Sequence, residues 1–139
     1  MEAAKRKFYD LVRVQGLEAN MISRAQEKSL LSQGVTHFNL SFQDAHGLFL
    51  SAVAEQNIAL ASDADHHIRT FLEQMAKNGK VSKKHFADAV AIYRRLTNGQ
   101  VPDGEARRQV KTLMQENAWR ARRSLVFPYP GSKRWFNKI

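Results

Sequence analysis

The chain has 139 residues, of which 43% are hydrophobic and 25% charged, and it contains no cysteine. This composition is typical of a folded globular protein, and it excludes disulfides, thiolate zinc sites and cysteine nucleophiles. The formal net charge of +9, with a pI near 10.2, indicates a nucleic acid or another polyanion as a partner.

The positive charge is distributed unevenly along the chain. Residues 29–76 hold one Lys or Arg against five Asp or Glu, whereas residues 104–139 hold nine against two. The excess of cations therefore lies in the C-terminal half, where we look first for a polyanion-binding surface.

The sequence also bears on the compartment. The N-terminal residues have no apolar run of signal-peptide length, and no segment reaches the ~20 apolar residues that a membrane helix requires. We expect a soluble, unprocessed, cytoplasmic protein that does not associate with membranes.

Apolar residues recur at helical spacing from the first residues onward. The spacing predicts one helix near residues 3–14 and a second near residues 18–32, with Gly16 between them. Residues 36–42 alternate apolar and polar side chains, but a lone strand has no partner, so we expect an extended linker there.

Four further helices follow. Ser41 and Asp44 begin a helix of residues 42–60, and Ser62 begins the next, which Asn78 and Gly79 end. Ser82 is a good N-cap for a fifth helix.

Pro102 opens the last helix, which the apolar pattern extends to about Leu125. The prediction is an all-α bundle of about five or six helices over residues 1–125, followed by a C-terminal arm of residues 126–139. We detect no internal repeat.

The last predicted helix has a basic face. On a helical wheel, Trp119 lies among the cations and away from the apolar residues. It is therefore either exposed, where a nucleic-acid base could stack on it, or covered by the aromatic residues of the arm. The wheel places the following residues on this face: Arg108, Lys111, Trp119, Arg122 and Arg123.

The arm combines a bend with a cationic aromatic end. Pro128 and Pro130 fix the backbone, and Pro130-Gly131 favours a turn that presents Lys133, Arg134 and Trp135 at a defined angle. Such a segment could lie along a nucleic acid or dock by its aromatic side chains into a groove of a partner protein.

Residues 75–90 resemble the calcium-loop half of an EF-hand, with Gly79 at the turn and a helix that begins at Ser82. Calcium requires several carboxylates in such a loop, but this loop has Asn78 among its ligand positions and His85 at the closing position. Calcium binding is not expected, and a calcium-free helix–loop–helix remains open.

The same two helices can be compared with a helix-turn-helix, in which the second helix enters the major groove of DNA. The match is weak, because Lys80 and His85 occupy positions that are usually apolar. Without that motif, the region still contains a second basic cluster that could contact phosphates. Its members are Lys77, Lys80, Lys83 and Lys84.

Catalytic and metal-binding patterns are scarce. Asp63, His66 and His67 lie close together in sequence, but acids in a first helical turn normally complement the helix dipole, and no third ligand is fixed by spacing. No glycine-rich phosphate loop or catalytic motif is present. We expect no enzyme activity, no metal and no cofactor.

Two functions remain open. The first is a small nucleic-acid-binding accessory protein, a subunit of a larger nucleoprotein assembly, which binds DNA or RNA with weak sequence specificity and favours single strands. Its predicted contacts are Arg108, Lys111, Trp119, Arg122, Arg123, Lys133, Arg134 and Trp135. The second is a non-enzymatic protein–protein adaptor whose aromatic arm docks on a partner, or which self-associates through its acidic and basic parts.

Overall fold

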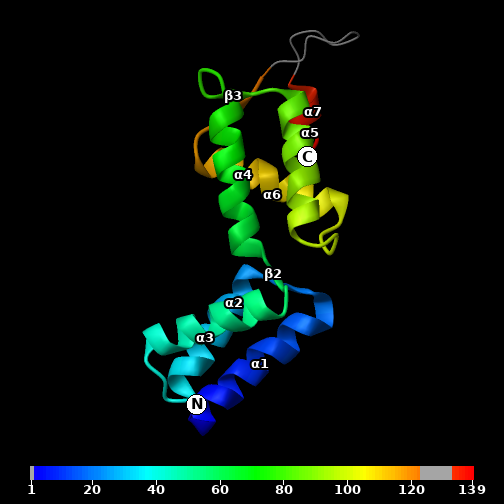
Figure 1. Ribbon diagram of the computed structural model, residues 1–139. Coiled ribbons are helices and arrows are strands. Elements are labelled where there is room, and N and C mark those ends of the chain that lie inside the picture. The colour runs from blue at the N-terminus through cyan, green and yellow to red at the C-terminus, as the bar shows by residue number, and fades with distance from the viewer. Residues whose placement is uncertain (1, 123–132) are drawn as a thin grey trace. The chain divides into compact units, whose positions relative to one another are not determined.

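The computed structural model of the chain describes residues 2–122 and 133–139 (Figure 1). Within these residues it contains seven helices and four strands of two residues each, so the predicted all-α fold class is confirmed. The chain divides into two compact units, residues 1–63 and residues 64–139, which we call unit 1 and unit 2.

Unit 1 contains two helix–strand segments in succession. Its elements are α1 (Ala3–Ala19), β1 (Met21–Ile22), α2 (Arg24–Thr36), α3 (Phe42–Glu55) and β2 (Ala59–Leu60). The two strands pair in parallel, with Met21 opposite Ala59 and Ile22 opposite Leu60. Residues 37–41 connect α2 to α3 without a strand, as predicted.

The ends of these helices follow from local chemistry. Ser23 caps α2 in a capping box with Gln26, and the hydroxyl of Ser41 accepts a hydrogen bond from the amide of Asp44 at 3.1 Å. The predicted break at Gly16 is wrong, because Gly16 lies inside α1 against Ile58. The helix ends instead at Ala19, and the next residue, Asn20, adopts a left-handed conformation with φ 57°.

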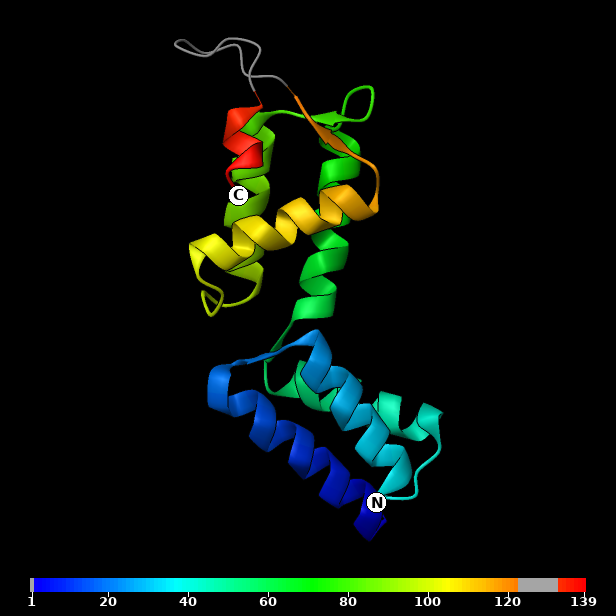
Figure 2. The same cartoon turned by 180° about the vertical axis from the view of Figure 1, so that it is seen from behind.

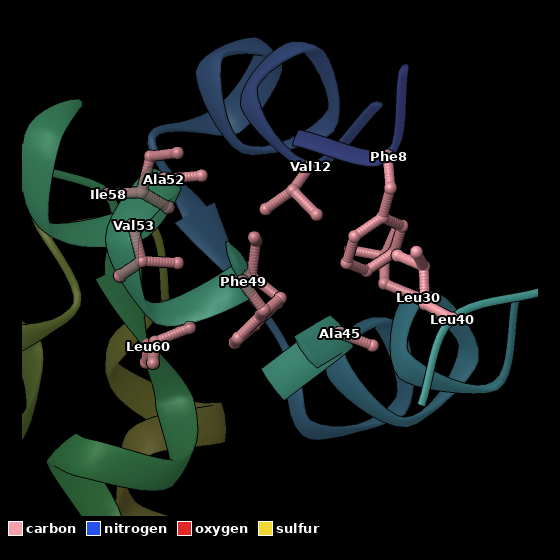
Figure 3. Packing of buried hydrophobic residues seen from close by; sticks show 11 residues of the cluster. Phe8, Val12, Leu30, Leu40, Ala45, Phe49, Ala52, Val53, Ile58 and Leu60 are labelled. Carbon is pink, nitrogen blue, oxygen red and sulfur yellow. The ribbon is translucent and has the colours of Figure 1, made fainter. Parts of the chain in front are cut away.

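The core of unit 1 is formed by apolar residues of its three helices and of both strands (Figure 3). Phe49 lies in the middle of the labelled side chains, and Phe8 lies beside Leu30 and Leu40. Phe8, Leu30 and Phe49 are fully buried. Removing such side chains from water is the main source of stability for a domain of this size.

Unit 2 repeats this plan and ends with a short additional helix (Figure 2). The unit boundary falls in the first turn of α4. The elements of unit 2 are α4 (Ala61–Met75), β3 (Lys80–Val81), α5 (Lys83–Leu96), α6 (Asp103–Glu116), β4 (Arg120–Ala121) and α7 (Arg134–Asn137). The segment from α4 to α5 is a helix–loop–helix, the arrangement that its EF-hand resemblance left open.

The helix predicted to reach Leu125 is shorter than expected. α6 ends at Glu116, Ala118 adopts φ 57°, and the chain then continues as β4. The amide of Arg120 donates to the carbonyl of Gly79 at 2.8 Å, and the amide of Arg122 donates to that of Val81 at 2.7 Å. Pairing with β3 therefore takes the place of the predicted helix at residues 120–122, and the rest of that prediction lies outside the described residues.

The two units share one order of elements, although no sequence repeat is evident. In each unit, a strand follows the first helix, a second and third helix come next, and another strand pairs in parallel with the first. Left-handed residues stand at corresponding points, at Asn20, Asn39 and Asn57 in unit 1 and at Asn78, Asn98 and Ala118 in unit 2. The chain is thus a structural duplication of one helical unit.

The core of unit 2 includes one fully buried carboxylate. Asp65 of α4 accepts a hydrogen bond from the side-chain amide of Gln109 of α6 at 3.0 Å. Apolar side chains of α4, α5 and α6, such as Leu72, Val90 and Leu113, are also buried in this unit. A hydrogen-bonded carboxylate inside the core joins α4 to α6 in one specific register.

Candidate functional site

The two units differ in charge far more than in fold. Residues 64–139 contain 16 Lys or Arg and six Asp or Glu, a net charge of +10. Residues 1–63 contain six Lys or Arg and seven Asp or Glu, a net charge of −1. Unit 2 therefore accounts for the basic character of the whole chain, and the candidate site belongs to it.

The described end of the arm packs against the rest of unit 2. Trp135 and Phe136 of α7 contact Phe86 of α5, with ring centroids 5.4 and 6.3 Å from the Phe86 ring. The indole N–H of Trp135 donates to the carbonyl of Arg122 at 3.2 Å. These contacts join the end of the chain to α5 and to the end of β4.

Lys111 of α6 fastens the other side of α7. Its ammonium donates to the main-chain oxygens of Phe136 and Ile139, both at 3.1 Å, and lies 4.7 Å from the centroid of the Phe136 ring. A cation is favourable at a helix C-terminus, where carbonyl groups lack partners in the helix. Lys111, predicted as a phosphate contact, thus has an intramolecular role here.

A cleft of about 490 Å³ lies where α5, α6 and α7 meet. Trp135 and Ile139 of the docked arm supply apolar lining, and Gly104 lies in the first turn of α6. The remaining lining residues are all cations: Lys83, Arg107, Arg108 and Lys138. The cleft therefore combines a high positive charge with an aromatic surface.

The two arginines that line the cleft, Arg107 and Arg108, differ in their contacts with neighbouring residues. Arg107 forms an exposed ion pair with Asp103, one helical turn earlier, at 3.0 Å. Arg108 extends toward the first turn of α6, where one of its terminal nitrogens lies 3.6 Å from the position that a Cβ on Gly104 would occupy. Asp103 offsets part of the charge of Arg107, so Arg108, Lys83 and Lys138 provide most of the attraction for an anion.

The predicted site residues are only partly brought together. Arg108 and Trp135 meet in the cleft, together with Lys83 from the second basic cluster. Lys133 is the half-buried N-cap of α7, and Arg134 lies exposed in its first turn. Arg122 is exposed beyond β4, whereas Arg123 lies outside the described residues.

Trp119 is not on a basic helical face, because α6 ends before it. Its amide donates to the carbonyl of Met114 at 2.9 Å, and its side chain is half-buried. Among the described aromatic residues of the arm, Trp135 and Phe136 cover Phe86 and make no ring contact with Trp119.

The second basic cluster surrounds the turn between α4 and α5. Lys77 and Lys80 exchange backbone hydrogen bonds at 3.0 Å, and both side chains are exposed. Lys83 and Lys84 begin α5, and only Lys83 reaches the cleft. This cluster therefore divides into a turn and a helix start rather than forming one face.

Sequence reasoning missed Arg107 and Lys138. Arg107 falls on the same exposed side of α6 as Arg108, but its spacing from Asp103 indicates an internal ion pair. Lys138 stands one turn after Arg134, a signal that becomes visible only once α7 is known to be helical.

Two other features are absent from the described part of the chain. No three His, Asp or Glu side chains gather there as a possible metal site, and none of its helices is long and apolar enough to cross a membrane. No protein family, curated protein or solved structure matches the chain. The candidate site therefore depends on its own geometry and charge.

Proposed function

We propose that the protein is a nucleic-acid-binding accessory protein whose unit 2 contacts the phosphates. The concentration of net charge in unit 2, +10 against −1 in unit 1, is the observation that carries this proposal. Neutralising phosphates releases condensed counterions, so a surface of this charge favours binding without any base-specific contact. The same proposal includes that the protein is a subunit of a larger nucleoprotein assembly.

Two features favour weak sequence specificity and a preference for single strands. The exposed cations of unit 2 are spread over several elements, such as the α4–α5 turn with Lys77, α6 with Arg108 and α7 with Arg134, rather than along one helix that could enter a groove. Trp119 and Trp135 are half-buried, which leaves part of each indole for stacking on unpaired bases.

Binding of labelled single- and double-stranded oligonucleotides over a series of salt concentrations tests the proposal. If about five phosphates are neutralised on a duplex, log K falls with log[salt] with a slope near −4 to −5. The test variant removes three exposed cations of unit 2 outside the cleft, Lys77→Gln, Lys80→Gln and Arg122→Gln.

The matched control removes three exposed cations of unit 1, Arg6→Gln, Lys7→Gln and Lys28→Gln. We expect the unit 2 variant to bind more weakly and to reduce the magnitude of the slope by roughly one for each phosphate that is no longer neutralised. The control should retain the original slope. A slope near zero for the unaltered protein, or equal weakening in both variants, would contradict the proposal.

A second candidate function, protein–protein docking, is favoured by a different surface. The exposed large hydrophobic residues among those described all lie in unit 1, and Phe42 is the most exposed at 59%. Leu31, Val35 and Phe42 line an apolar groove of about 360 Å³ along α2 and the start of α3. An adaptor would use this groove more readily than Trp135 and Phe136, which contact Phe86.

Sedimentation of the protein alone over a range of concentrations tests this second function for self-association. Phe42→Ser in the groove is compared with Leu50→Ser, an exposed apolar residue of α3 that does not line it. Association that Phe42→Ser reduces and Leu50→Ser preserves would support docking through the groove. Association unaffected by Phe42→Ser would contradict it.

A further inference from the structure

The cleft in unit 2 has the chemistry of a site for one nucleotide rather than for a polyanion in general. Arg108, Lys83 and Lys138 offer charged donors that suit phosphate oxygens, and a guanidinium can bind two of these oxygens at once. Trp135 and Ile139 supply an apolar surface beside these donors. A simple polyanion would use the cations alone, whereas a nucleotide uses both parts.

The size of the cleft agrees with this assignment. Its volume of about 490 Å³ lies within the range of roughly 300–1,000 Å³ that is typical of small-molecule sites. The lining comes from three elements, with Lys83 on α5, Arg108 on α6 and Trp135 on α7. A nucleotide that contacts all three elements would have its phosphate held by cations of α5 and α6 and its base held by Trp135 of α7.

The docked arm forms part of the cleft. Trp135, Lys138 and Ile139 all belong to the segment that Lys111 and Phe86 hold in place. Any ligand that binds only the docked form must also stabilise docking, because binding and docking are thermodynamically linked. The cleft is thus complete only when the end of the chain is packed against α5 and α6.

We infer that the cleft is a nucleotide-binding seat, in which the phosphate lies among Lys83, Arg108 and Lys138 and the base packs against Trp135. This inference rests on the proposed nucleic-acid function, for which the seat would hold one nucleotide of a single strand. The base contact is apolar stacking, so the seat discriminates little among bases and accepts a free nucleoside monophosphate.

Fluorescence titration of the full chain with adenosine 5′-monophosphate tests the inference. Trp119→Phe serves as the background, so that Trp135 is the only tryptophan and reports on the cleft. Adenosine and inorganic phosphate are titrated in parallel, each carrying one half of the ligand chemistry. If the phosphate and the nucleoside bind together in the cleft, the nucleotide should quench Trp135 at concentrations roughly tenfold lower than those required of adenosine or of inorganic phosphate.

Two matched variants complete the experiment. Arg108→Gln should weaken nucleotide binding roughly tenfold, because it removes a charge-assisted hydrogen bond to the phosphate. Arg95→Gln removes an equal charge from an exposed position of α5 outside the cleft lining and should change binding less than twofold in the same buffer. Both residues are exposed, so both variants should fold.

Three results would overturn the inference: no saturable quenching by the nucleotide, equal affinity for inorganic phosphate, or equal effects of the two variants. The outcome is separable from that of the proposed function. Salt-dependent oligonucleotide binding without nucleotide binding would remove the seat and leave the proposed function intact. Nucleotide binding without oligonucleotide binding would retain the cleft as a site and remove the proposed function.

Discussion

Lys111 and Phe136 are joined by two kinds of contact, a hydrogen bond from the ammonium to the carbonyl of Phe136 at 3.1 Å and a position 4.7 Å from the centroid of its ring. The two residues are 25 positions apart in the chain. One side chain of α6 therefore holds both the backbone and the ring of a helix only four residues long, too short to be stable by itself.

We expect Lys111→Met to release the arm. The substitution keeps most of the apolar stem but removes the charged hydrogen bonds and the cation–π contact, and together these should reduce the free energy of unfolding by about 1–3 kcal/mol. Urea unfolding measures the reduction. In the Trp119→Phe background, Trp135 emission should shift to longer wavelength as its indole becomes more exposed to water.

Lys84→Met is the control for this change, since Lys84 is an exposed lysine of α5 outside the lining of the cleft. It should leave both the emission and the unfolding midpoint close to those of the unaltered protein. Identical behaviour of the two variants would mean that Lys111 does not hold the arm.

Gly34 in α2 is a position where helix packing requires the absence of a side chain. A Cβ there would lie 2.9 Å from the Cβ of Ala45 and 3.0 Å from two ring atoms of Phe8. Phe8 and Ala45 are fully buried, so neither can move away cheaply. Overpacking exceeds the gain in helix propensity, and Gly34→Ala should lower stability by about 1–2 kcal/mol.

Gly47 provides the opposite case in α3, because nothing lies within 4 Å of a Cβ placed there. Gly47→Ala should raise stability by about 0.5–1 kcal/mol through helix propensity alone. The urea unfolding midpoints of the two variants test both expected changes in stability. If Gly34→Ala were as stable as Gly47→Ala, the close contact of α2 with α1 and α3 would not be tight in solution.

Tyr9 of α1 carries a pH-dependent contact of unit 1. Its hydroxyl donates a hydrogen bond to a carboxylate oxygen of Glu55, and this bond, with a smaller effect of desolvation, raises the pKa of Tyr9 above 10.0. The folded state thus retains the phenol proton more strongly. The resulting stability is present below pH 10.0 and is lost as the pH rises through the raised pKa.

Glu55→Gln should move the pKa of Tyr9 back toward its ordinary value, since the neutral amide is a weaker acceptor and no longer repels the phenolate. Ultraviolet absorbance titration follows phenol ionisation, and Tyr9→Phe assigns the step. An unchanged Tyr9 titration in Glu55→Gln would show that the hydrogen bond does not control this group.

The helical character of the chain could be predicted because its signals are local. Ser41 and Ser82, which the sequence predicted at helix starts, each accept a backbone hydrogen bond at the beginning of α3 and α5. Caps and periodic apolar residues act within one or two turns, so a sequence reveals them directly.

The duplication and the short strands could not be predicted, because they depend on contacts far apart in the chain. Met21 pairs with Ala59 and Lys80 pairs with Arg120, and strands of two residues have no periodicity to detect. The predicted division into a bundle of residues 1–125 and an arm of residues 126–139 stays a prediction, since residues 123–132 lie outside the described part.

The candidate site was found only in part for the same reason. Charge counts pointed to the half of the chain that contains the candidate cleft, but the cleft depends on where α7 packs. Lys111 and Trp135 looked like ligand contacts because each is a suitable residue type in a basic segment. Their intramolecular contacts, to Phe136 and to Phe86, follow only from tertiary structure.

Ala118 explains the largest error in the predicted fold and provides the last prediction. It adopts φ 57°, whereas asparagine occupies all five of the other left-handed non-glycine positions among the described residues. Alanine is a strong helix former, so its sequence signal extends α6, although its conformation ends it. A left-handed alanine is strained by about 1–2 kcal/mol, and asparagine tolerates this region better.

We therefore expect Ala118→Asn to raise the free energy of unfolding by about 0.5–1 kcal/mol, a gain measurable as a higher urea midpoint with an unchanged slope. Ala87→Asn, an exposed site within α5, should have the opposite sign, because asparagine is a poorer helix former than alanine. If α6 instead continued through Ala118 in solution, both substitutions would destabilise the protein, and the pairing of β4 with β3 would no longer explain where the helix ends.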